Sequence, residues 1–264
     1  MEMRVLVIFG ALLSLSSNGV ASIHTADLGE LELAVWQVRS DFHMLTVMKG
    51  DQIYDSSLED SIARGRKALS RLERGAENGE EQQLITKLRG EWTNFEEAAS
   101  SNTIVEHGYT DAYTILDVNE IPIVMLEQKA AFEGGVGGNF DDIYGLAAFL
   151  QRLSSEYLNL AADPTGGAAI GTDEGRLDFK EAVPQFESML AAAKERHAGD
   201  EAMVRALESV SLKWGFVRQS MINFSENAVP YLVYRYTSQM VDTLDQATKL
   251  ASTEVEKPTL GPVD

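Results

Sequence analysis

Two arginines are the residues of this sequence whose type and setting best suit the binding of a charged group. Arg39 lies in residues 33–47 and Arg152 in residues 146–161, and both stretches are otherwise largely apolar. A guanidinium group in an apolar setting is costly unless a carboxylate or an anionic ligand pairs with it. Such a group could hold a planar oxyanion through two parallel hydrogen bonds. Alternatively, the stem packs while the charged head reaches water; this second arrangement is favoured for Arg39, and the two stand equal for Arg152.

Residues that commonly carry catalysis or bind metals form no known pattern here. None of the four histidines has a glutamate three residues before or after it (His24, His43, His107 and His197). This excludes the Glu-x-x-His pairs of di-iron bundles, and no His-Glu-x-x-His zinc motif occurs. The chain has no cysteine, which excludes disulfides, thiol catalysis and thiolate metal sites. We therefore predict neither an enzyme nor a metal site nor another cofactor, and we expect His43 to be a core or surface side chain.

The charge balance limits the partners. The sequence has 22 Lys and Arg residues against 41 Asp and Glu residues, a net charge of −19 at pH 7. Phosphate-rich partners require clustered cations, and a field of this sign repels them. The composition therefore excludes nucleic acid and anionic membrane surfaces as partners, and the acidity is better explained by solubility than by a cationic partner.

The N-terminus has the pattern of an export signal. Residues 1–4 are short and carry a positive charge, residues 5–15 are apolar, and residues 16–22 are small and polar. An apolar core of this length is too short to span a bilayer, which takes about 20 residues. We predict a signal peptide over residues 1–22, no transmembrane segment after its cleavage, and a periplasmic or secreted location. An uncleaved N-terminal anchor is the alternative.

The elements that must position the arginines are helices. Apolar residues recur at spacings of three and four over residues 28–48, which predicts one helix with a single buried face. Similar patterns recur up to residue 133, so residues 23–133 form a first helical stretch. The four glycines of residues 134–138 end it. Helical patterns resume over residues 139–253, and we predict a disordered tail over residues 254–264.

The two helical stretches align with each other. Placing Arg39 over Arg152 is a shift of 113 residues, and placing Trp92 over Trp214 is a shift of 122. The nine extra residues fall in a predicted loop at residues 163–171, where an insertion costs little. We predict an all-α fold: an antiparallel helical bundle made of two tandem repeats of about four helices each. One long bundle and two separate bundles both fit this pattern.

The sequence around the second arginine resembles a known family. Residues 151–156, QRLSSE, are similar to part of the Gly-Arg-Gln-Arg-Met-Leu-Ser-Gln signature of PilJ-type sensor domains. These are periplasmic helical bundles of type IV pilus chemotaxis transducers and of nitrate- and nitrite-responsive sensor kinases. In that family an arginine of the signature reads the oxyanion. The resemblance implies a ligand-binding role for Arg152, together with Gln151 and Ser155, and more loosely for Arg39.

Three positions depart from that signature. Phe149 stands where the family has glycine, Leu150 where it has the first arginine, and Glu156 where it has the final glutamine. A glutamate beside the site is expected to repel an anion. The resemblance is confined to about half of the chain, mainly residues 146–250.

These observations favour an exported, soluble helical-bundle protein of the sensor-domain type. It would bind a small ligand, with an oxyanion as the candidate, or a signalling partner. A membrane sensor kinase, a chemotaxis transducer or an envelope complex would receive the signal, and a homodimer is one expected assembly. The alternative is a structural or adaptor protein of an envelope or pilus-associated complex.

Overall fold

The computed structural model describes residues 23–163, 175–226 and 228–255, and these residues form an all-helical bundle. One isolated β-bridge joins His24 to Val136. The predicted signal peptide and most of the predicted 163–171 loop lie outside the described residues. The helices, in chain order, are α1 (Thr25–Val47), α2 (Gln52–Gly75), α3 (Gly79–Ser100), the short α4 (Ile104–His107), α5 (Ala112–Ala130), α6 (Asp141–Ala162), α7 (Phe179–Arg196), α8 (Glu201–Ile222) and α9 (Pro230–Val255).

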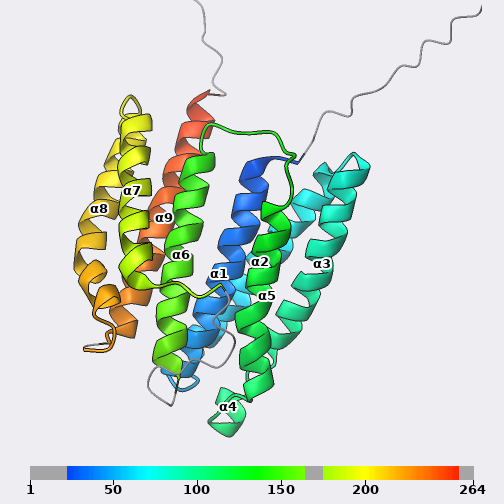
Figure 1. Cartoon of the computed structure of the whole chain (residues 1–264), viewed down its shortest axis with the longest axis vertical. Helices are drawn as coiled ribbons and strands as arrows, with labels where there is room; N and C mark the ends of the chain where they lie inside the picture. Colours follow the sequence, from blue (N-terminus) through cyan, green and yellow to red (C-terminus); the bar gives the residue numbers. More distant parts are fainter. Residues whose placement is uncertain (1–22, 164–174, 227, 256–264) are drawn as a thin grey trace, which may run out of the picture.

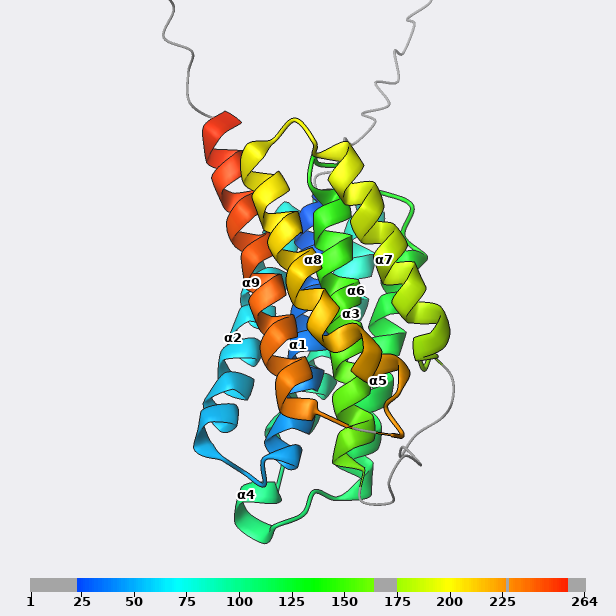
Figure 2. The same ribbon diagram turned by 90° about the vertical axis from the view of Figure 1, so that its left-hand side faces the viewer.

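Helices α1 and α6 lie side by side in the centre of the molecule and share the largest interhelical interface (Figure 1). Helices α2, α3 and α5 surround α1 on one side, and α7, α8 and α9 surround α6 on the other (Figures 1 and 2). Every residue of α1 from Ala34 to Leu45 is consequently buried. The prediction of a single buried face for this helix is therefore wrong, because α6 covers one side of it and α2, α3 and α5 cover the other.

The two central helices start at the same end of the bundle. The Val136 backbone, between α5 and α6, accepts a hydrogen bond from the Thr25 amide (3.1 Å) and donates one to the Ile23 carbonyl (2.8 Å). The glycine-rich connection that leads into α6 is thus tied to the start of α1. As a result α1 and α6 run parallel, and residues at the same height can meet across their interface (Figure 1).

Helix ends follow local chemistry. Asn78 and Glu81 form a capping box at the start of α3, and Asp51 and Asp111 accept backbone amide hydrogen bonds at the starts of α2 and α5. Pro122 lies inside α5 without ending it. Helix α9 continues to Val255, so the first two residues of the predicted tail are helical. Residues 256–264 lie outside the described residues.

Each half of the bundle has its own apolar core. One cluster joins buried side chains of α1, α2, α3 and α5, and the other joins those of α6, α7, α8 and α9. In the first, the Trp92 ring fills the space beside Gly65, where an added Cβ would lie 1.9 Å from it. In the second, Phe186 and Trp214 pack with their ring centroids 4.4 Å apart. The interface between the two cores is where polar residues gather.

Candidate functional site

The interface between α1 and α6 contains buried polar side chains from both helices. The Gln151 amide donates to the Ser40 hydroxyl across it at 2.7 Å. A well-packed apolar interface would hold two helices together equally well. Buried polar groups therefore indicate that this interface either selects one specific pairing of α1 with α6 or has a function. We call the buried polar side chains of this interface the polar seam; its members are Gln37, Arg39, Ser40, His43, Gln151, Ser154, Ser155, Glu156 and Asn159.

Arg39 is fully engaged inside the protein. Its guanidinium donates to the Asn119 side-chain carbonyl, the Ser155 hydroxyl and the Glu156 carboxylate, each at 3.0 Å. The side chains of Arg39 and Glu156 are each 4 % exposed, so the ion pair is buried. The favoured expectation that the Arg39 head reaches water is therefore wrong. The parallel register of α1 and α6 brings a glutamate of the second stretch to this height.

The same network holds His43 in a neutral form. The His43 ring lies 2.9 Å from the Asn119 side-chain oxygen, and the Asn119 amide donates to Asn159 at 3.2 Å. Burial, together with the nearby charge of Arg39, lowers the pKa of His43 from 6.5 to about 3. His43 is thus a core residue that helps to join α1, α5 and α6.

Arg152 is placed differently. Its guanidinium is half-buried, donates to the Gly175 carbonyl at 2.8 Å, and lies 5.1 Å from the centroid of the Trp36 ring. No carboxylate in the described part of the chain forms an ion pair with it. Burial lowers its pKa, and the neighbouring charges of Glu32 and Glu156 raise it. Both of these carboxylates already have other partners, Lys129 and Arg39 respectively.

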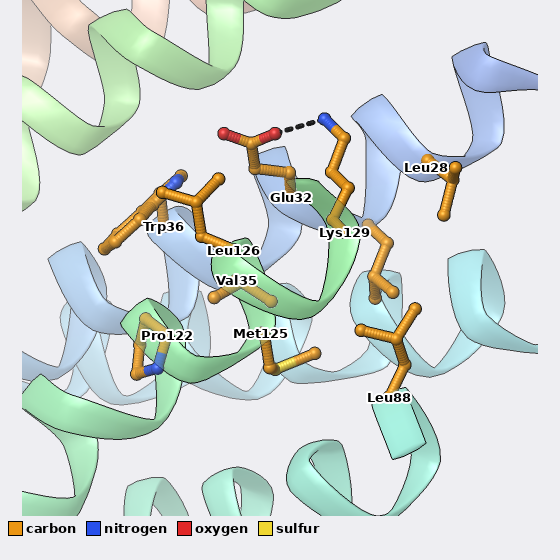
Figure 3. Close-up of a pocket in the computed structure, with 10 residues that line it drawn as sticks. Leu28, Glu32, Val35, Trp36, Leu88, Pro122, Met125, Leu126 and Lys129 are labelled. Carbon is orange, nitrogen blue, oxygen red and sulfur yellow. Dashed lines mark hydrogen bonds and ion pairs between the residues drawn. The ribbon is translucent and has the colours of Figure 1, made fainter. Parts of the chain in front are cut away.

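The Trp36 ring lies beside the Arg152 guanidinium. The ring is completely buried, and its indole N–H has no hydrogen-bond partner among the described residues. Figure 3 shows Trp36 beside a small apolar cavity between α1, α3 and α5, with the Glu32–Lys129 ion pair at its edge. The cavity measures about 20 Å³, which is room for about one water molecule. It is therefore too small to hold an organic ligand.

A buried carboxylate occupies the other side of α1. Asp41 accepts hydrogen bonds from the Ser61 hydroxyl of α2 and, at 2.7 Å, from the Tyr234 hydroxyl of α9. Burial raises the pKa of Asp41 from 3.8 to about 6, although both hydrogen bonds and the charge of Arg64 lower it. This cluster ties the first half of the bundle to the last helix.

The structure brings together three of the four sequence-predicted site residues in the polar seam: Arg39, Gln151 and Ser155. Arg152 lies at the edge of the seam with its head toward Trp36. Sequence reasoning missed Asn119 and treated Glu156 as a repelling charge. The signal in the sequence was the alignment of the two arginine-bearing helices, which places Arg39 opposite Arg152. Glu156 follows Arg152 by one helical turn and therefore comes within reach of Arg39.

Within the described residues, no group of three His, Asp or Glu side chains is arranged to hold a metal ion. The helices there are all too short or too polar to cross a bilayer. No model of a known protein family matches the chain, and neither a curated protein nor a solved structure matches it.

Proposed function

We propose that this protein is a non-enzymatic helical bundle of the sensor-domain type that binds a small oxyanion at Arg152. The observation that carries the proposal is a half-buried guanidinium with no ion-pair partner in the described part of the chain. Arginine stays charged inside proteins, so this charge pays a desolvation cost that a bound anion would offset. The same guanidinium lies 5.1 Å from the centroid of the Trp36 ring, whose indole N–H has no hydrogen-bond partner among the described residues and is a second donor in this region.

Arg39 has a supporting role in this proposal. Its three hydrogen bonds leave it committed to protein acceptors, and its charge offsets that of Glu156. Glu156 also lies 3.5 Å from the Arg176 guanidinium. With its charge compensated in this way, Glu156 repels an anion at Arg152 less than an isolated glutamate would. The glutamate that replaces the glutamine of the PilJ-type signature is therefore compatible with anion binding in this proposal.

We further propose that the two halves are tandem repeats, residues 23–133 and 139–253. Two features support this: each half places an arginine-bearing helix at the centre, and each has a tryptophan on its third long helix, Trp92 on α3 and Trp214 on α8. The Trp92 indole donates to Glu96 and the Trp214 indole to Glu187. The parallel arrangement of α1 and α6 fits a pseudo-twofold axis along the bundle.

Export to the periplasm remains part of the proposal, resting on the pattern of residues 1–22. A binding protein of this kind passes its signal to another protein. A membrane sensor kinase, a chemotaxis transducer or an envelope complex would be the receiver, and a second copy of the chain is a further candidate partner.

Thermal unfolding with added anions tests the binding site. Nitrate, sulfate, phosphate and formate would each be compared with chloride at equal ionic strength. An anion at ten times its Kd stabilises the folded state by about 1.4 kcal/mol, which raises Tm by about 3–6 °C for a chain of this size. Arg152→Ala should abolish the rise, whereas Arg205→Ala, an exposed arginine of α8, should keep it. If every anion acts like chloride on the unaltered protein, the proposed function fails.

An exposed apolar surface favours the adaptor alternative. Leu212 and Phe216 lie one turn apart on α8 with 69 % and 62 % of their areas exposed. Phe216 stacks on Tyr236 of α9 with ring centroids 5.4 Å apart. Exposed apolar patches commonly mark protein contacts. An adaptor should capture a partner from periplasmic extract; Phe216→Ser should release that partner, and Arg152→Ala should not.

A further inference from the structure

A groove separate from the Arg152 site lies between α2 and α9. These two helices lie next to each other in Figure 2. Its volume is about 510 Å³, within the range of small-molecule pockets. Small and apolar side chains of α1, α6 and α9, including Ala34, Ala147 and Leu244, form its floor. At one end Tyr54 and Tyr234 close the space between the two walls with ring centroids 5.6 Å apart.

The two walls of the groove carry opposite charges. Helix α2 contributes three cations at helical spacing, Arg64, Lys67 and Arg71, and α9 contributes the carboxylates of Asp242 and Asp245. No ion pair between described side chains joins α2 to α9 across the groove. The opposite charges thus face each other without meeting.

Some of these charges are already compensated by neighbours on the same side. Arg71 pairs with Asp27 and Glu30 of α1, and Lys249 pairs with Asp245 within α9. Arg64 and Lys67, the two α2 cations nearer the tyrosine end, therefore have no ion-pair partner among the described residues.

Three charged groups therefore remain for an outside molecule. Among the described residues, Lys67 and Asp242 have no hydrogen-bond or ion-pair partner, and Arg64 donates only to the Ser61 hydroxyl at 3.3 Å. Arg64 lies close enough to Asp242 to lower its pKa, but partial burial in the groove outweighs this and raises the pKa of Asp242.

We propose that this groove binds a small zwitterion that carries both a carboxylate and an ammonium group. The carboxylate binds Arg64 and Lys67, the ammonium group binds Asp242, and a short apolar body lies on Ala34 and Ala147. A purely anionic ligand would meet Asp242 and Asp245 on the second wall, and a purely cationic one would meet the α2 cations. Only a molecule with both charges matches both walls.

Titration calorimetry with dialanine and two capped analogues tests this site on the whole protein. Dialanine carries both charges, N-acetyl-dialanine only the carboxylate, and dialanine amide only the ammonium group. Dialanine should bind with one-to-one stoichiometry, and each capped analogue should bind at least about ten-fold more weakly, as expected for losing one charged hydrogen bond.

Matched substitutions locate the binding. Lys67→Gln and Asp242→Asn, both at exposed positions, should each weaken dialanine binding about ten-fold or more. Lys180→Gln on α7 and Asp117→Asn on α5 make the same chemical changes outside the groove and should leave the Kd unchanged. Arg152→Ala should also leave it unchanged, which separates this site from the oxyanion site. The proposal is overturned if dialanine does not bind, if the capped analogues bind equally well, or if neither groove variant weakens binding.

Discussion

Replacing Glu156 with Gln should leave a buried guanidinium without its main counter-charge. Arg39 and Glu156 are each 4 % exposed and their side chains lie 3.0 Å apart. Glutamine keeps nearly the same shape and one carbonyl acceptor, so the change removes charge rather than volume. Removing one partner of a buried ion pair costs about 3–5 kcal/mol. Because Asn119 and Ser155 still accept hydrogen bonds from Arg39, we expect the lower end of that range, about 3 kcal/mol.

Urea unfolding followed by far-ultraviolet circular dichroism at pH 7 gives the free energy directly. In thermal unfolding the same loss corresponds to a Tm lower by about 6–12 °C. A double-mutant cycle with Arg39→Met should return an interaction energy of about 2 kcal/mol or more. Glu201→Gln is the matched control, since Glu201 is 93 % exposed in its pair with Arg205, and it should change stability by about 0.5 kcal/mol or less.

The opposite result has a clear meaning. If Glu156→Gln costs less than about 1 kcal/mol and the cycle shows no coupling, the pair behaves like exposed surface charges. The account of Arg39 and Glu156 as a buried, mutually dependent pair would then be refuted.

Two further substitutions test other parts of the structure. Because the pKa of Asp41 is about 6 in the folded protein against 3.8 ordinarily, its contribution to stability is present below about pH 4 and lost as the pH rises to about 6. Asp41→Asn should therefore gain about 3 kcal/mol relative to wild type between pH 4 and pH 7 in urea titrations; an equal difference at both pH values would contradict this. Gly65→Ala should cost about 1–3 kcal/mol because its Cβ meets the Trp92 ring, whereas Gly90→Ala, which meets nothing, should stabilise α3 by about 0.5–1 kcal/mol in the same assay. A neutral Gly65→Ala would show that the ring moves aside freely.

The helical character of the chain could be predicted because helices are specified locally. The spacing of Leu28, Leu31 and Val35 along one face, and capping residues such as Asn78, act within a few residues of themselves. The glycines of residues 134–138 likewise mark the connection between α5 and α6 without any knowledge of the fold.

The sequence also identified the arginines as unusual, because a cation within an apolar stretch needs a partner wherever it lies. It did not identify the partner. Arg39 meets Glu156, which is 117 positions away in the chain, and Asn119, which is 80 away. Periodicity shows that a helix has an apolar face, but it carries no information about which helix covers the remaining faces.

The sequence by itself thus determined the helices, their approximate ends and the two arginines that require compensation. The tertiary structure alone decided that residues 34–45 of α1 are buried on every side, that Arg39 forms a buried ion pair while Arg152 forms none with any described residue, and that Asp41 is shielded from water. The physical reason is range: hydrogen bonding and capping in a helix act over about four residues. Burial and charge compensation instead depend on segments that only packing brings together.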